Sequence, residues 1–200
     1  MKNNFQKKKG FTLIELLLVI GIIMIISASA VLVLNPTEIM AQSRDRVRMS
    51  DMNALKSDIN TFIANTNVTL TLGSCTTNGR LTAGTAGVTP SPFGAHPLVT
   101  SGDIVSDVTI TGTGWVDVNF NNMNGFPPLS VLPKDPVNNN TYLYAYKCEN
   151  VNYTYKFVSR LESLKFRDNM KIDGGIYNCA TAGNYATTDC WYEVGSNPNL

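Results

Sequence analysis

The sequence predicts an α+β protein in which a long N-terminal helix, half membrane-spanning and half amphipathic, packs on a C-terminal antiparallel β-sheet. Three observations carry this prediction. Residues 11–34 are almost entirely apolar, the following segment repeats apolar side chains at helical spacing, and short runs beyond residue 104 are rich in β-branched and aromatic residues. The predicted organisation is therefore four parts, namely 1–10, 11–34, 35–66 and a globular head over 67–200.

The apolar part, residues 11–34, contains a single charge, Glu15, in 24 residues. As a helix it would be about 36 Å long, enough to cross a hydrocarbon core of about 30 Å. Four lysines, at positions 2, 7, 8 and 9, precede it. The positive-inside rule places this basic cluster in the cytoplasm and the head on the outer side of the inner membrane.

Glu15 decides between three interpretations of this segment. A secretory signal peptide fits the basic start and the Ala28-Ser29-Ala30 sequence, which would allow cleavage after Ala30. An uncleaved anchor also fits. Neither accounts for a carboxylate near the start of a membrane helix, which is costly unless it serves a function.

The run from Lys7 to Glu15 resembles the prepilin signal of type IV pilins and type II secretion pseudopilins. The resemblance implies that a membrane peptidase cleaves the leader 1–10 after Gly10 and methylates Phe11. Glu15 then becomes the fifth residue of the mature chain. In the family its counterpart pairs with the N-terminus of a neighbouring subunit, which would neutralise an amine and a carboxylate in low dielectric.

Gly21 and Pro36 are predicted to interrupt or bend the helix. At Pro36 the sequence allows either a kink or a true break with Thr37 as a new N-cap. The second half then continues to about Asn65 as an amphipathic helix. Its apolar stripe is the expected platform for the sheet and comprises Met52, Leu55, Ile59, Phe62 and Ile63.

The head is predicted to begin with a long, largely irregular connection over 68–102. Four strands are expected after it, over 105–111, 115–120, 141–147 and 150–159, and the last two should form a hairpin that turns around residues 148–150. Tyrosines alternate along this hairpin. We interpret them as core and cross-strand packing in preference to an aromatic ligand site.

Four cysteines in an exported head favour two disulfides, and the residues alone leave three connectivities open. The resemblance favours Cys179–Cys190, because many type IV pilins close a C-terminal loop in this way. Cys75–Cys148 is then the remaining pair.

No cofactor is expected. The chain has one histidine and no CxxC pair, which excludes a conventional zinc site. Some relatives bind calcium in the C-terminal loop, where Asp173 and Asp189 could supply oxygen ligands. Calcium takes six or more ligands, so two acids are too few to predict a site.

The function implied by the resemblance is structural and not enzymatic. The subunit would polymerise with copies of itself and other pilin-like subunits, after processing by prepilin peptidase. An inner-membrane assembly platform with its ATPase would drive this, since the chain has no phosphate-binding loop. The filament would serve adhesion, motility, DNA uptake or secretion, and nucleic acid would be a partner only in DNA uptake.

Two alternatives to this function stay open. A secretion pseudopilin is the first, because Pro133-Lys134-Asp135-Pro136 resembles a pseudopilin segment, and a secreted binding module is the second.

Overall fold

The computed structural model describes residues 10–66, 69–75, 79–87, 92–93, 99–176, 190–197 and 199–200, without the side chains of 31–34. The chain divides into two compact units, one extending to Met40 and the other comprising Ala41–Leu200. The second unit begins inside the predicted amphipathic helix, so most of that helix belongs to the head.

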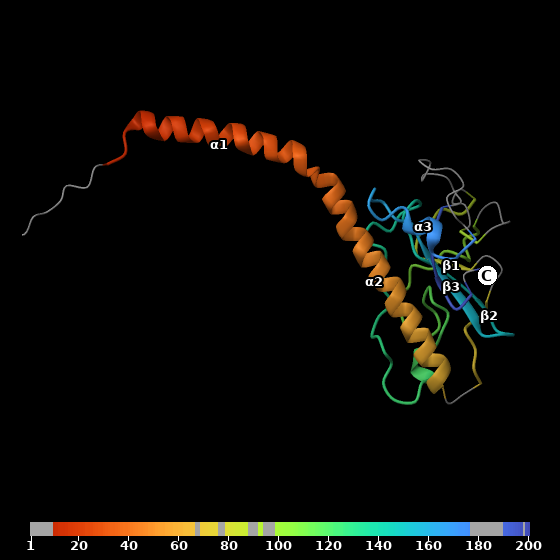
Figure 1. Ribbon diagram of the computed structural model, residues 1–200. Helices are drawn as coiled ribbons and strands as arrows, with labels where there is room; N and C mark the ends of the chain where they lie inside the picture. Colours follow the sequence, from red (N-terminus) through yellow and green to blue (C-terminus); the bar gives the residue numbers. More distant parts are fainter. Residues whose placement is uncertain are drawn as a thin grey trace, which may run out of the picture. The chain divides into compact units, whose positions relative to one another are not determined.

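Two helices, α1 (Leu13–Leu34) and α2 (Pro36–Asn65), occupy the predicted helical region (Figure 1). Asn35 caps the first with a left-handed backbone, φ 41°. Proline disfavours a helical residue before it but is well suited to the first helical position, so the break falls at Asn35. Thr37 is accordingly inside α2, and its predicted N-cap role is wrong. The helix α1 continues through Gly21, so an interruption there is wrong, while a bend at Gly21 stays a prediction.

The head contains a four-stranded antiparallel sheet in the order β1-β2-β3-β4, which confirms the α+β class. Its strands are β1 (Arg80–Leu81), β2 (Ala145–Glu149), β3 (Thr154–Ser159) and β4 (Tyr192–Gly195). A 3₁₀ helix, η1 (Phe120–Asn122), and a short helix, α3 (Asn169–Ile172), lie in the connections. Strands β2 and β3 form the predicted hairpin, but its turn is at residues 150–153, with Glu149 opposite Thr154.

The strands predicted over 105–111 and 115–120 are wrong. These segments fold back through single hydrogen bonds, from Trp115 N to Asp107 O and from Phe120 N to Ile110 O, with one isolated bridge between Thr111 and Asn119. Asp107 also accepts hydrogen bonds from the Thr109 backbone and hydroxyl. Such local side-chain bonds compete with a regular ladder. Conversely, β1 falls in the connection that was expected to be irregular.

Both faces of the sheet are covered. Alternation along β2 and β3 sends aromatic side chains toward α2 and smaller apolar side chains to the opposite face. The first face forms the main core with Met52, Leu55, Ile59 and Phe62 of α2, as predicted. The opposite face packs with Leu81, Phe93, Val99 and Trp191.

The tyrosines are packing residues with anchored hydroxyls. Tyr144 Oη donates to Asp51 Oδ2 at 2.7 Å, and Tyr155 Oη lies 2.7 Å from Asn60 Oδ1. Tyr146 Oη donates to Leu72 O at 2.9 Å. Burial raises the pKa of all three, that of Tyr155 to about 12. The hydroxyls therefore stay protonated and join the sheet to α2 and the segment after it.

Candidate processing and assembly site

The start of α1 is built by a capping box. Gly10, Phe11 and Thr12 precede the helix, and Thr12 is its N-cap with an extended backbone, φ −85° and ψ 154°. Its hydroxyl accepts from Glu15 N at 3.3 Å, while Glu15 Oε2 accepts from Thr12 N at 3.5 Å. The reciprocal pair satisfies two backbone donors that have no partner inside the helix.

The predicted scissile bond lies outside the helix. Gly10 is exposed, a Cβ on it would meet nothing within 4 Å, and Phe11 is 79% exposed. A non-helical, uncovered peptide bond is accessible to a protease, whereas a bond inside a helix is not until the helix opens. The preceding leader, with its lysines, lies outside the described residues.

The hydrogen bond of the Glu15 carboxylate is made to the residue after Phe11. Phe11 is not helical, and the group bonded to the Glu15 carboxylate is the N–H of Thr12. That donor is one residue beyond the amine that cleavage after Gly10 would create. The carboxylate is thus held at the end of α1 where the new cation would appear, and the N-terminal end of a helix favours a negative charge.

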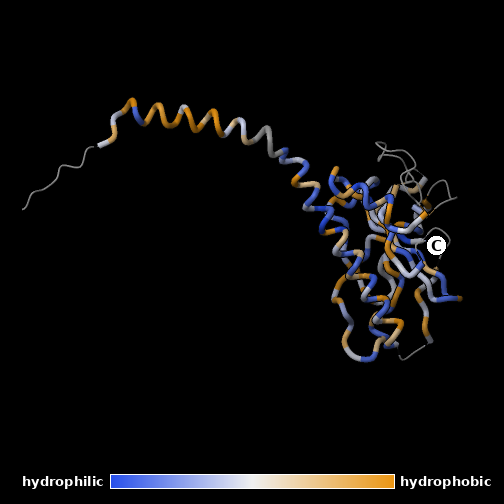
Figure 2. Tube along the Cα trace, viewed as in Figure 1, coloured by the Kyte–Doolittle hydropathy of each residue, from blue (hydrophilic) through white to orange (hydrophobic). Residues whose placement is uncertain are grey.

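From Leu16 to Ala30, α1 carries no charge and is predominantly apolar. An 18-residue window, Leu13–Ala30, has mean hydropathy 2.6 and no residue buried within the chain. Figure 2 shows this apolar character along the helix. A side chain at Gly21 would meet nothing within 4 Å, so the fold of one subunit does not require glycine there. By length and composition this helix can cross a membrane, and it needs lipid or other protein to cover it.

The head holds a buried ion cluster that the sequence analysis missed. Arg48 is fully buried and contacts three acids: Asp45 at 2.9 Å, Asp135 at 2.6 Å and Glu162 at 2.5 Å. Burial opposes its charge, but the bonds to Asp135 and Glu162 prevail and raise the pKa of Arg48. Asp135 belongs to the Pro133–Pro136 segment, so this segment is attached to α2 through its carboxylate. The sequence signal for this cluster was weak: an arginine lies among acidic residues on α2. Two of its partners, Asp135 and Glu162, are distant in sequence.

A second buried ion pair joins β3 to β4. Lys156 Nζ lies 2.8 Å from Glu193 Oε1, and both side chains have no exposed surface. Asp173 accepts from Gly175 N at 3.0 Å and from Glu193 N at 2.8 Å, so its oxygens bind the backbone of a turn and of β4. Asp189, the other acid considered for calcium, lies outside the described residues. Within the described parts of the chain, no three potential ligands gather in the way a metal ion requires.

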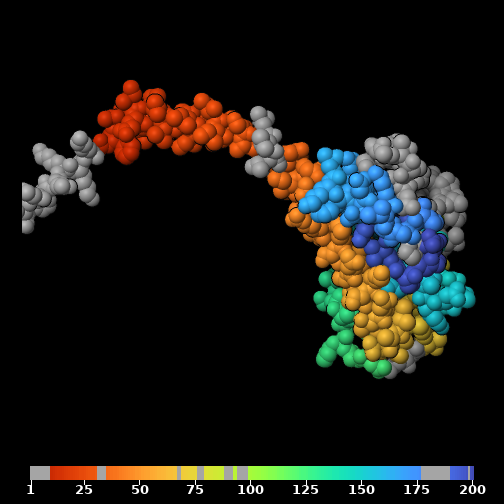
Figure 3. Space-filling view, in the orientation of Figure 1, coloured from red at the N-terminus to blue at the C-terminus, as the bar shows by residue number. Residues whose placement is uncertain are grey.

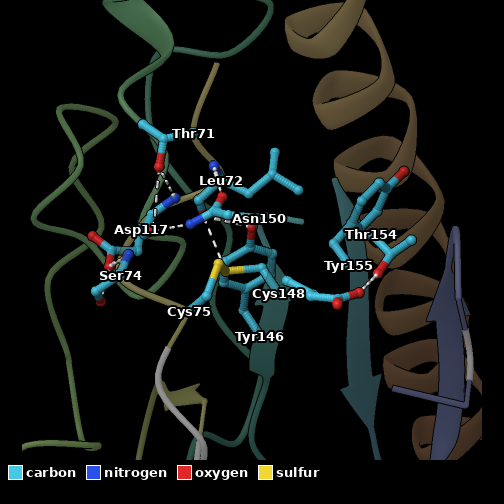
Figure 4. Close-up of a disulfide and its surroundings, with 12 residues drawn as sticks. Thr71, Leu72, Ser74, Cys75, Asp117, Tyr146, Cys148, Asn150, Thr154 and Tyr155 are labelled. Atoms are coloured by element: carbon cyan, nitrogen blue, oxygen red, sulfur yellow. Dashed lines mark hydrogen bonds between the residues drawn. A yellow bond between two sulfur atoms is a disulfide. The ribbon is translucent and has the colours of Figure 1, made fainter. Parts of the chain in front are cut away.

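Cys75 and Cys148 form a disulfide with an S–S distance of 2.04 Å, the pairing left by the resemblance (Figure 4). Beside it, the Asn150 side chain accepts a hydrogen bond from Leu72 N through Oδ1 at 2.8 Å and donates one from Nδ2 to Gly73 O at 2.8 Å. Asp117 accepts from Ser74 and pairs with Arg80 at 2.9 Å. Cys190 is buried and disulfide-bonded, while Cys179, its predicted partner, lies outside the described residues.

Comparison with known families identifies the N-terminal segment. Residues 5–31 match the model of the prokaryotic N-terminal methylation motif. The chain carries a prepilin-type N-terminus. This motif is the hallmark of type IV pilin and pseudopilin precursors, a structural and not an enzymatic class. No curated protein and no solved structure matches the chain. The prepilin-type segment includes Gly10, Phe11 and Glu15, and its apolar part coincides with most of α1.

Proposed function

We propose that this chain is the precursor of a structural subunit of a type IV pilus-like filament. It is inserted in the inner membrane by α1 with the head outside, cleaved after Gly10, methylated on Phe11, and polymerised through α1. The observation that supports this most directly is the methylation motif leading into an apolar helix with no buried residue. A heterologous contact between such helices does not close and therefore produces a fibre.

The partners follow from the same proposal. They are copies of this chain and other pilin-like subunits, prepilin peptidase, and an inner-membrane assembly platform with its ATPase. The subunit itself is not an enzyme and needs no cofactor. The resulting filament is extracellular or periplasmic and serves adhesion, motility, DNA uptake or secretion.

The mature N-terminus tests the proposal. Mass spectrometry of the processed protein is expected to find N-methylated Phe11. An N-terminus at Val31 would instead identify a secreted module released after Ala30, and an intact Met1 with the leader still attached would identify an uncleaved anchor. The alanines of that alternative cleavage sequence lie inside α1.

A secretion pseudopilin is the second candidate, supported by the Pro133–Pro136 segment. Electron microscopy of cells labelled with an antibody to the head separates the two. Long surface fibres that contain the chain support the pilus, whereas processed subunits confined to the envelope support the pseudopilin.

A further inference from the structure

The start of the head carries a compact patch of basic and apolar side chains. It consists of Arg46 on α2 and the consecutive residues Leu164, Lys165, Phe166 and Arg167, and we call it the basic-aromatic patch. The Arg46 guanidinium is 5.9 Å and the Lys165 ammonium 5.4 Å from the Phe166 ring centroid. Leu164 is 63% exposed, and Arg46 and Lys165 are exposed. No acid is among these five residues, although Ala41–Leu200 has 12 Lys and Arg against 13 Asp and Glu.

Hydrogen bonds hold the patch on the part of α2 that begins the head. The backbone N–H groups of Glu162 and Ser163 donate to Asp45, the former at 2.9 Å and the latter at 2.7 Å. Ser163 Oγ in turn accepts from Phe166 N at 3.2 Å. Figure 3 shows the light-blue segment that contains these residues lying against orange residues of α2. The exposed cations Arg46 and Lys165 are thus presented together by a fixed turn, whereas Arg167 is partly exposed with its Nε buried.

The position of the patch in the chain limits how far it can be from the membrane. Arg46 comes 16 residues after Ala30, the end of the apolar window. Even a fully extended connection would span at most about 58 Å, and a helical one about 24 Å. A tether of this length maintains a high effective concentration of the patch at the bilayer surface.

We propose that, in the membrane-inserted subunit, the basic-aromatic patch binds the headgroup surface of anionic phospholipid. This rests on the proposed function, which puts α1 in the bilayer. Lysine and arginine are attracted to an anionic surface, and the exposed Leu164 with the partly exposed Phe166 ring suits the interfacial region. The head is therefore docked on the membrane until assembly extracts the subunit. A basic surface with an aromatic ring also suits single-stranded nucleic acid, but the tether supplies lipid and not a nucleic acid.

Site-specific fluorescence on the full chain tests the docking. A single cysteine replaces Leu164 and receives an environment-sensitive dye; the described native cysteines are all in disulfides. The chain is reconstituted in phosphatidylcholine vesicles with or without 30% phosphatidylglycerol, each also prepared with brominated lipid as a quencher. The matched control carries the dye at Val151, which is 82% exposed in the β2–β3 turn.

The expected result is a blue shift and strong quenching at position 164 in the anionic vesicles, reversed by 1 M salt and absent at position 151. Removing two cations with Arg46→Gln and Lys165→Gln should lower the ratio of docked to undocked head about 30-fold. Equal quenching at the two positions, or quenching that ignores phosphatidylglycerol, would overturn the proposal. So would tight, patch-dependent binding of a fluorescent oligonucleotide without lipid quenching. Flotation with the vesicles reports insertion of α1 separately, so a chain that fails to float counts against the proposed function instead.

Discussion

The helix α1 and the head differ in how their charged side chains are paired. The helix α1 has one carboxylate, and the hydrogen bond that it accepts among the described residues comes from the backbone N–H of its own N-cap. The head buries Arg48 and Lys156 completely and pairs the first with three acids and the second with Glu193. A buried charge whose ion-pair partners lie in the same subunit stabilises that subunit. A charge in an apolar helix that lacks an ion-pair partner within the described residues is available to a partner. The difference separates residues that build the subunit from those that would connect subunits.

The largest expected effect concerns the isolated carboxylate. Glu15→Ala should reduce incorporation into filaments at least tenfold, because the new N-terminal amine loses its counter-charge in low dielectric. Cleavage after Gly10 should continue. Both are measured by immunoblotting of sheared filaments and membranes.

Thr12→Ala is the matched control, because it removes the cap hydroxyl and leaves the carboxylate. Losing an N-cap costs about 1 kcal/mol of helix stability. Thr12→Ala should therefore assemble. Equal assembly defects in the two variants would show that Glu15 serves only the start of the helix, and normal assembly of Glu15→Ala would contradict the proposed pairing.

The head gives the next largest effect. Arg48→Met leaves Asp45 and Asp135 without their cation and Glu162 with Arg44 alone, and it should destabilise the head by about 3–5 kcal/mol. Arg46→Met, one half-turn away and exposed, should change stability by less than about 0.5 kcal/mol. Denaturant unfolding followed by near-ultraviolet circular dichroism measures both. A similar small loss in the two variants would mean that the buried cluster contributes little.

Aromatic packing provides an uncharged comparison of similar size. Phe157 is fully buried and its ring contacts those of Trp115, Tyr146 and Tyr155 at centroid distances of 5.1–6.0 Å. Phe157→Ala should cost about 3–5 kcal/mol in the same assay. Phe126→Ala should cost almost nothing, since that ring is 96% exposed. A destabilising Phe126 variant would contradict the described packing of its loop.

The smallest effect is a pH dependence of the ion cluster. Burial opposes the ionisation of Glu162, but the bonds from Arg44 and Arg48 outweigh it and lower its pKa. A lowered folded-state pKa adds stability that is present above the unfolded value of about 4.3 and disappears as pH falls through the folded value. Glu162→Gln should therefore be less stable than the parent at pH 7, with a difference that shrinks toward pH 3. A difference that stays constant with pH would exclude this contribution.

The sequence could predict features that depend on neighbouring residues, but not those that depend on contacts between distant ones. The methylation motif, the span of α1 and the apolar stripe of α2 are local patterns, and they were recognised from a few neighbouring residues. The β2–β3 hairpin was found because its strands are adjacent and alternate clearly. Strands β1 and β4 are two and four residues long and exist only through pairing with distant partners. Likewise, no local pattern showed that Arg48 would meet Asp135 and Glu162, which are brought to it by the fold.

The helix α2 and the segment after it are attached to the rest of the head by two different kinds of bond. Near its start, Arg44 and Arg48 bind Glu162 and Asp135, and shortly after its end Cys75 is bonded to Cys148. Acid weakens the first fastening and leaves the second intact, whereas a reductant does the reverse. The attachments near the two ends of one helix therefore respond to different reagents, to protons at one and to thiols at the other.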